Sequence, residues 1–479
     1  MRRSPRQSHL TFTLLALLAF LVTCTPAYRP GLPPSSPFLE DKELGHGVAT
    51  GDVTDSSALV WFRTTGPANV QVEWAREGSG TARSPVIATT QDHDFTASVR
   101  VEGLVPASSY SYRILEVSGV EQVVLQEVGK GQFRTSASSN VPETVTFLWG
   151  GDLGGQQQCR LEGSEYAIFD RMFEARPAFA LLLGDLIYAD GRCPSPPNVP
   201  GGDFLASTLE GFRAKHRYQR EDRALRRFLS VVPVYAMWDD HEVRNNFSGP
   251  DEPLMPAGRQ ALLEYWPIGT PPEDPHRLYR KFRRGADLEL FLLDTRQYRS
   301  RNEEPDGEHK TMLGTAQREW LVDGLTRSTA TWKVIATSVP LSNRKPGTAL
   351  LPGNDSWAPG PDGTGYQTEL RTIVSTILDR RIRNVVWLAA DVHYAQINAY
   401  DPDGDGVADF HEFISGPLSA ASVKPLLPDP ALRPSTLYSG GGFSNFGLVT
   451  VNGTSLRVAI LDEEGDLRFA RTFSARGTK

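Results

Sequence analysis

The stretch VPVYAMWDDHEVRNNF, residues 232–247, changes character in its middle. An apolar run from Val234 to Trp238 stops at four ionisable residues, 239–242. Short continuous apolar runs are typical of strands covered on both faces, so we predict a buried strand over residues 230–238. The acidic residues then lie at its carboxyl end, where open α/β sheets bind their ligands.

The same pattern recurs along residues 140–479. Further strands are predicted over 145–149, 179–183, 288–293, 334–337 and 385–390. Helices are predicted over 164–175 and 314–327, the second with Thr315 as N-cap. Apolar strands that alternate with helices indicate an α/β domain. From Phe443 on, a meander is expected, with a hairpin turn at Asn452-Gly453.

Carboxylates follow several of these strands. Those that we expect to converge, with a histidine two residues beyond the last, are Asp152, Asp185, Asp240, Asp391 and His393. Asp294 follows a further strand and is treated separately. Carboxylates at close quarters raise one another's pKa unless a cation lies among them, so the sequence predicts a metal centre.

The remaining segments have other patterns. Residues 43–137 show short alternating strands without helices, which predicts an all-β, fibronectin-like sandwich that serves as a spacer. Residues 28–42 are a Pro/Ser-rich linker. The N-terminus has a basic segment before a largely apolar run of 13 residues, Leu10 to Val22, which indicates a signal peptide over 1–27. Cleavage is expected near Ala27 or, if the leader is of the lipoprotein type, before Cys24.

Composition limits the function. The net charge is −7, and loss of three leader arginines makes it −7 − 3 = −10, which argues against a nucleic-acid-binding surface. In an exported protein, Cys159 and Cys193 are the remaining pair of thiols, which form a disulfide or are unrelated. We expect a monomer that reaches a membrane only through a lipid anchor.

The ordered motifs resemble those of a known family. Gly151-Asp152, Gly184-Asp185-Leu186-Ile187-Tyr188, Trp238 to Glu242 and Asp391-Val392-His393 resemble the PhoD-type alkaline phosphatases, members of the calcineurin-like metallophosphatases that are similar to purple acid phosphatases. The segments 293–299 and 411–413 add weaker matches. The resemblance implies a catalytic domain of two packed sheets flanked by helices, after the sandwich.

The resemblance also implies a dinuclear or larger metal centre. Asp152, Asp185, Tyr188 and His393 would form a first site, suited to Fe³⁺ because a phenolate is a hard donor. Asp185 would bridge to a second site with Asp240 and Asp391, whose oxygen ligands favour Ca²⁺, Mg²⁺ or Mn²⁺. Many relatives carry a cysteine where Asp152 stands. Cys159 is an alternative thiolate ligand, although its spacing fits a loop better.

Residues beside the ligands would bind substrate. His241 is a candidate proton donor to the leaving oxygen or a phosphate contact, and Arg296 a candidate two-point clamp on phosphate. Asn245 and Asn246 would bind phosphate or metal, or form a local turn. Asp239 and Glu242 would orient the histidine or support the ligands.

A second acidic segment lies at 401–412. Its acids at positions one, three and five, Gly406 at six and Glu412 at twelve match a calcium loop, but the flanks read as strands. This segment has two interpretations. It is a solvated hairpin turn, or it holds a structural calcium on Asp401, Asp403, Asp405 and Asp409. Glu412 would otherwise serve the active site.

These observations predict an exported phosphoesterase of the alkaline phosphatase D type, which hydrolyses phosphate esters with a metal-activated hydroxide. One alternative is a phosphodiesterase or phospholipase that acts on lipid or cell-wall diesters. Another is a calcium-binding cell-surface protein with an inactive phosphatase-like domain.

Overall fold

The computed structural model describes Met1 and residues 44–118, 124–156, 158–343 and 353–477. The leader and the linker predicted above lie outside these residues. Residues 40–479 form one compact unit. Among the described residues, no helix has the length and apolar character needed to cross a bilayer.

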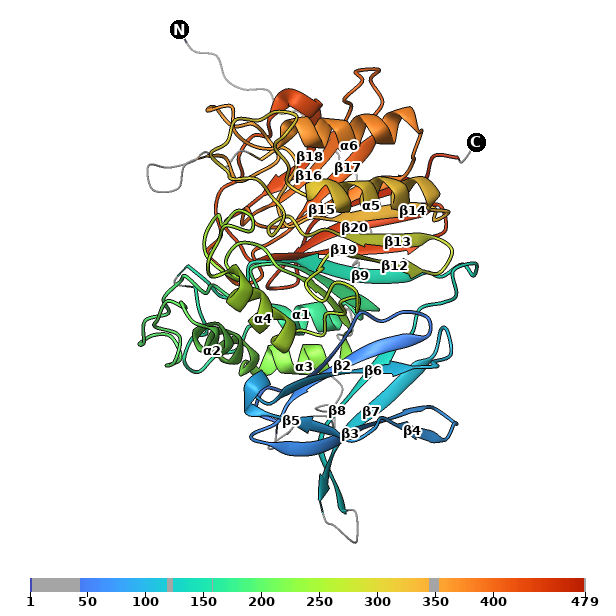
Figure 1. The fold of residues 1–479 in the computed structure, drawn as a ribbon. Helices are drawn as coiled ribbons and strands as arrows, with labels where there is room; N and C mark the ends of the chain where they lie inside the picture. Colours follow the sequence, from blue (N-terminus) through green and yellow to red (C-terminus); the bar gives the residue numbers. More distant parts are fainter. Residues whose placement is uncertain (2–43, 119–123, 157, 344–352, 478–479) are drawn as a thin grey trace. The chain divides into compact units, whose positions relative to one another are not determined.

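Two large sheets form the body of the molecule (Figure 1). The first has nine strands, in the order β21 (Leu467–Ser474), β20 (Ser455–Asp462), β19 (Asn445–Asn452), β9 (Val145–Gly150), β10 (Phe179–Leu183), β11 (Val234–Met237), β1 (Val48–Gly51), β2 (Ser57–Arg63) and β6 (Thr96–Glu102). The second has seven, in the order β12 (Arg280–Arg284), β13 (Leu288–Leu292), β14 (Trp332–Ala336), β15 (Val385–Ala389), β17 (Phe410–Ile414), β16 (Ala395–Tyr400) and β18 (Pro434–Gly440). In each sheet the central strands β9–β11 and β13–β15 run parallel.

The two sheets pack face to face. Their shared core contains residues such as Phe147, Leu181, Leu290, Val334 and Leu388, from alternating positions of strands in both sheets. Because both faces of these strands are buried, the strands read as continuous apolar runs.

Helices cover the two outer faces. Helices α1 (Ile168–Glu174), α3 (Arg223–Val231) and α4 (Met255–Tyr265) pack on the nine-stranded sheet. Helices α5 (Gly314–Arg327) and α6 (Gln367–Asp379) pack on the seven-stranded sheet, as Figure 1 shows. Helix α2 (Leu209–Arg220) contacts α4, and short 3₁₀ turns occupy Gln91–His93 and Pro430–Leu432. The predicted fold class, a β-sandwich followed by two packed sheets with flanking helices, is confirmed.

The N-terminal sandwich shares a sheet with the rest of the chain. Its outer sheet consists of β3 (Ala68–Arg76), β4 (Thr81–Arg83), β5 (Ile87–Thr89), β7 (Ser109–Ser118) and β8 (Val124–Arg134). This sheet buries its inner face against β1, β2 and β6. Strand β1 then pairs in parallel with β11, where Gly51 lies opposite Val234. A Cβ on Gly51 would lie 2.5 Å from the carbonyl oxygen of Pro267, so this close approach requires glycine.

Three local predictions were wrong. Ser230 belongs to α3 and not to a strand, because Asp222 caps that helix through the backbone N–H of Leu225 and the helix continues to Val231. The helix predicted over 164–175 begins at Ile168. Thr315 lies inside α5, whose first residue, Gly314, donates its backbone N–H to the Thr311 hydroxyl at 2.8 Å.

Candidate metal centre

Four aspartates follow strand ends and are almost completely buried. Asp152 follows β9, Asp185 follows β10, Asp240 follows β11 and Asp391 follows β15, each with at most 5% of its surface exposed. The chain leaves three of these strands through a left-handed residue, with φ of 64° at Asp152, 52° at Asp185 and 69° at Asp391. Aspartate tolerates this conformation better than most residues, although it is unfavourable. The sharp turns direct the carboxylates to one region.

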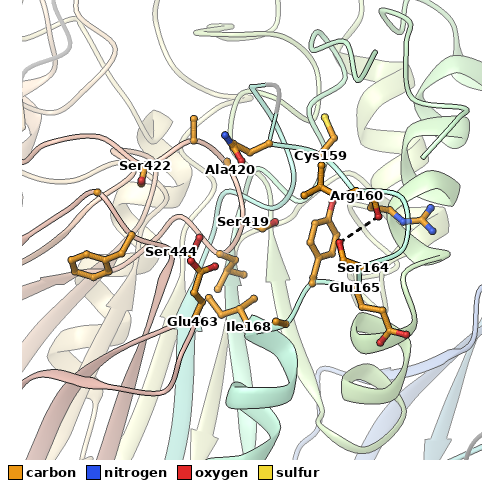
Figure 2. A pocket seen from close by; sticks show the side chains of 18 residues that line it. Cys159, Arg160, Ser164, Glu165, Ile168, Ser419, Ala420, Ser422, Ser444 and Glu463 are labelled. Atoms are coloured by element: carbon orange, nitrogen blue, oxygen red, sulfur yellow. Dashed lines mark hydrogen bonds between the residues drawn. The ribbon is translucent and has the colours of Figure 1, made fainter. Parts of the chain in front are cut away.

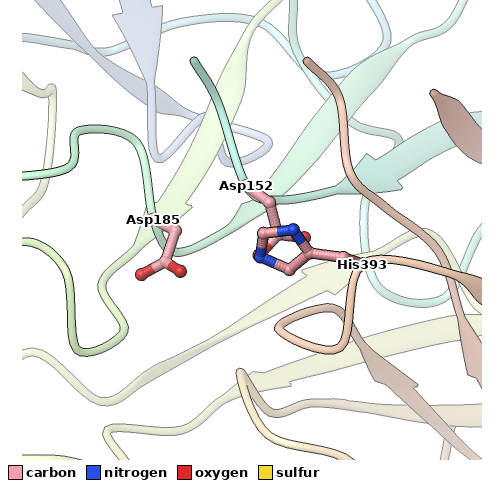
Figure 3. Close-up of side chains that lie close together, drawn as sticks. All are labelled: Asp152, Asp185 and His393. Carbon is pink, nitrogen blue, oxygen red and sulfur yellow. The ribbon is translucent and has the colours of Figure 1, made fainter. Parts of the chain in front are cut away.

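The first cluster contains Asp152, Asp185 and His393, whose candidate ligand atoms lie within 4.8 Å of one another (Figure 3). His393 Nε2 lies 3.6 Å from Asp152 Oδ1 and 3.1 Å from the Tyr188 hydroxyl. Two atoms bound about 2.1 Å from one ion at a right angle are about 3 Å apart. The spacing of these donors therefore fits ligands of a single ion.

Two further clusters adjoin the first. One contains Asp185, Asp240 and His241, and the other Asp239, Asp240 and Asp391, again with ligand atoms within 4.8 Å. Asp185 belongs to the first cluster and to its neighbour, which is the position that a bridging carboxylate requires. All six metal ligands predicted from the sequence therefore lie in one region, and Asp239 joins them.

Electrostatic repulsion acts within this region. Burial, together with Asp240 and Asp239, raises the pKa of Asp185 well above its usual range. Burial, followed by the charges of Asp185 and Asp152, also raises the pKa of Tyr188 well above that of a free tyrosine. Cations among these side chains would offset both effects, so the donor set fits a metal centre with more than one ion.

His241 is held by a carboxylate that the sequence did not single out. Its Nδ1 lies 2.6 Å from Asp190 Oδ1, and its ring packs on Tyr188 with 4.2 Å between centroids. Asp190 also accepts the backbone N–H of Asn245 at 2.7 Å. Asp190 stands two residues after Tyr188, and this short spacing after a ligand motif is the signal that could have identified it.

Glu242 stabilises the loops that carry the ligands. Its carboxylate accepts the backbone N–H groups of Asp185, Leu186 and Asp239 at 3.1, 2.7 and 2.8 Å. One buried side chain thus joins the turn after β10 to the turn after β11. This contact agrees with the supporting role that the sequence left open for Glu242.

The prediction that Arg296 clamps phosphate is wrong for this structure. Its side chain is completely buried, and its guanidinium binds Asp239 at 2.6 Å and Asp355 at 2.7 Å. Asp240 Oδ2 lies 3.8 Å away. Arg296 therefore neutralises protein carboxylates behind the ligands, and a substrate has no access to it. Sequence proximity to a strand end did not reveal Asp355, which comes from a distant loop.

A cavity of about 360 Å³ opens beside the ligands. Its lining includes Asp185, His241, Asn245, Asp391 and His393, which places Asn245 where a substrate would bind. Asn246 lies behind it and donates its backbone N–H to Asp240 at 2.7 Å. The lining also includes residues that the sequence did not indicate, namely Gln156, Asn343, Val392, Tyr394, Val423, Lys424 and Leu426.

The two cysteines lie in a different place. Cys159 and Cys193 are joined by a disulfide, so Cys159 offers no thiolate to the metal centre. Cys159 lines a second cavity of about 400 Å³, together with Ser419 and Glu463 (Figure 2).

The acidic turn at 401–409 joins β16 to β17. Asp401, Asp403 and Asp409 offer oxygen atoms within 4.8 Å of one another. The carboxylates of Asp401, Asp403 and Asp405 also accept backbone N–H groups of the turn. Glu412 is fully buried and binds the Tyr400 hydroxyl at 2.5 Å, so the twelve-residue calcium loop is wrong. A calcium ion at the turn stays a prediction.

Comparisons with known proteins agree with this geometry. The fold is similar to that of PhoD: a structure of PhoD superposes with a TM-score of 0.73, at 21% identity over 92% of this chain and 94% of that one. A structure of a purple acid phosphatase from yellow lupin (Lupinus luteus) superposes with a TM-score of 0.62, at 13% identity over 89% of this chain and 73% of that one. Residues 153–446 match the model of PhoD-like phosphatases, and residues 31–137 that of their N-terminal domain. The chain therefore belongs to the PhoD-like phosphatase family.

One curated relative is alkaline phosphatase D of Bacillus subtilis (strain 168). It is 29% identical over 398 residues, which are 72% of this chain and 64% of the relative. The chain thus spans less than two thirds of the length of that protein.

Proposed function

We propose that this protein is an exported, metal-dependent phosphoric ester hydrolase. The observation that carries the proposal is the convergence of Asp152, Asp185, Asp240, Asp391 and His393 in a chain of the PhoD-like phosphatase family. The name of its relative, alkaline phosphatase D, supports a phosphate ester as substrate. The signal-peptide pattern of residues 1–27 supports export.

The ligands divide by chemistry. Asp152, Asp185, Tyr188 and His393 would hold a ferric ion, because carboxylate, phenolate and imidazole are donors that suit it. Asp185, Asp240 and Asp391 offer oxygen atoms that would hold Ca²⁺, Mg²⁺ or Mn²⁺. When bound, such ions polarise phosphoryl oxygens and lower the pKa of water.

The other residues of the cavity bind and move protons. His241, held at Nδ1 by Asp190, presents Nε2 as the ring nitrogen that would deliver a proton to the leaving oxygen. Asn245 lines the same cavity and would donate its amide to a phosphoryl oxygen. Glu242 keeps the loops of the ligands in register, so substrate and ligands meet in a fixed geometry.

The test is the substitution Asp185→Asn, with 4-nitrophenyl phosphate as substrate. We expect loss of hydrolysis with an unchanged circular dichroism spectrum, because the shared ligand loses its charge while its volume is kept. Asp251→Asn is the matched control, since the Asp251 side chain is 67% exposed. Full activity of Asp185→Asn would refute the proposal.

Two further measurements separate the alternatives. Faster hydrolysis of bis(4-nitrophenyl) phosphate than of the monoester would assign the protein as a diesterase. Elemental analysis of protein purified from its own host, with an absorption spectrum, tests the metals. A ferric–phenolate band would place iron on Tyr188, whereas calcium alone with no turnover would assign an inactive calcium-binding protein.

A further inference from the structure

A short segment borders the cavity beside the metal centre. We call residues Val423, Lys424, Pro425, Leu426 and Leu427 the rim segment. It is fixed to the centre through His393, whose backbone carbonyl accepts the N–H of Val423 at 3.0 Å and whose Nδ1 lies 2.5 Å from the carbonyl oxygen of Ala421. At its other end, Gln396 Nε2 donates to the carbonyl of Leu426 at 3.1 Å. The rim segment therefore has a defined position relative to the candidate ligands.

The rim segment supplies positive charge. Among the described residues that line the cavity, Lys424 is the one lysine or arginine, and the carboxylates of Asp185 and Asp391 lie in the same lining. Arg296, which follows strand β13, is fully buried and bound to protein carboxylates. An ammonium group attracts a phosphate anion, so Lys424, in the lining of this cavity, is placed to bind it.

The rim segment also exposes apolar side chains. Val423 is 46% and Leu426 57% exposed, although both line the cavity. Val392 and Tyr394, from the neighbouring segment that carries His393, contribute further apolar lining. Apolar surface at the mouth of a polar site is typical of ligand pockets, in which a few charged groups fix orientation and apolar groups contact the rest of the ligand.

We propose that Lys424 binds a phosphoryl oxygen of the substrate and that Val423 and Leu426 contact an apolar alcohol group of the ester. The preferred substrates would then be phosphate esters of aromatic or other apolar alcohols. This inference rests on the proposed function, because it assigns the substrate of the same site.

Two non-hydrolysable phosphonates test both halves of the proposal. Calorimetric titration of the full chain, purified with its metals, compares methylphosphonate with phenylphosphonate. We expect Lys424→Met to weaken both about tenfold, as loss of a charge-assisted contact should. Lys424→Arg should stay within about threefold of wild type, because the charge is kept. Leu426→Ser should weaken phenylphosphonate about fivefold and leave methylphosphonate unchanged.

Salt dependence supplies a readout that a purely structural role would not change. Phosphonate binding to wild type should weaken between low and high salt, and Lys424→Met should lose most of that dependence, because exposed charges are screened. Lys130→Met, in the N-terminal sandwich, is the matched control and should behave as wild type.

The outcomes are distinguishable. Unchanged methylphosphonate affinity and salt dependence in Lys424→Met would overturn the role of the lysine. Equal losses for both phosphonates in Leu426→Ser would overturn the apolar contact. A wild-type protein that binds neither phosphonate would contradict the proposed function itself.

Discussion

Replacement of Arg296 by methionine separates a structural role of this residue from a role in substrate binding. The substitution keeps much of the side-chain volume. It removes the buried guanidinium that binds Asp239 and leaves Asp355 with Arg299 as its remaining arginine partner. Removal of one member of a buried ion pair costs about 3–5 kcal/mol. Both contacts are short and the guanidinium is fully buried, so we expect a loss of free energy of unfolding within this range.

This loss converts to a shift in melting temperature. The compact unit has 479 − 39 = 440 residues. At about 2.1 cal/mol/K per residue, its entropy of unfolding is about 0.9 kcal/mol/K, so the melting temperature should fall by about 3–5 °C. Differential scanning calorimetry measures the shift, and initial rates at a temperature well below the transition give KM.

The KM of the folded fraction decides between the two roles. A structural arginine predicts a lower melting temperature with KM unchanged. Arg299→Met is the matched control, because Arg299 is equally buried and binds Asp355 at 2.5 Å but not Asp239. It should lose stability on the same scale. A variant Arg296→Met that melts like wild type and shows a tenfold higher KM would refute this reasoning.

Three further perturbations have defined outcomes. Serine at both Cys159 and Cys193, which are separated by 34 residues, should lower the free energy of unfolding by at most about 4 kcal/mol, measured in urea under non-reducing conditions. Burial lowers the pKa of His216 to about 3, so between pH 8 and pH 5 the unfolded chain gains a proton that the folded chain does not, and the free energy of unfolding falls. His216→Phe should reduce this fall by about 2 kcal/mol. The same pH dependence in the variant and in wild type would contradict the assignment. Glu242→Gln should destabilise by about 1–3 kcal/mol in thermal melts, because a donor amide replaces an acceptor that holds three backbone N–H groups; a wild-type melting temperature would contradict this.

The sequence located the metal-binding region because strand ends are encoded locally. Apolar runs set strands β9, β10, β11 and β15. Parallel pairing brings the carboxyl ends of β9–β11 to one edge of the first sheet, and β15 contributes Asp391 from the second sheet, which packs on the first. Hence Asp152, Asp185, Asp240 and Asp391 could be grouped from their position after each run. The motif that ends at Tyr188 and the motif that ends at His393 added these two residues to the group.

The environment of single side chains could not be predicted in the same way. Arg296 follows a strand and Glu412 lies in one. Asp355, the partner of Arg296, comes from a distant loop, and Asn398 and Tyr400, the partners of Glu412, lie on the paired strand β16, so long-range contacts that no local pattern records set both environments. The rim segment around Lys424 has no motif of its own, and its hydrogen bonds with His393 and Gln396 fix it beside the centre.

The parallel pairing of β1 with β11 has a consequence for protein engineering. Asp52, directly after β1, binds Arg280 at 2.9 Å and accepts the backbone N–H of Gly269, and the Tyr235 hydroxyl donates to the carbonyl of Val53. Expression of the catalytic region without its sandwich would expose the edge of β11 and leave these polar groups without their partners. Such a truncation should aggregate, so we expect the sandwich and the catalytic region of this protein to fold as one unit, and the junction near residue 140 is a poor place to shorten it.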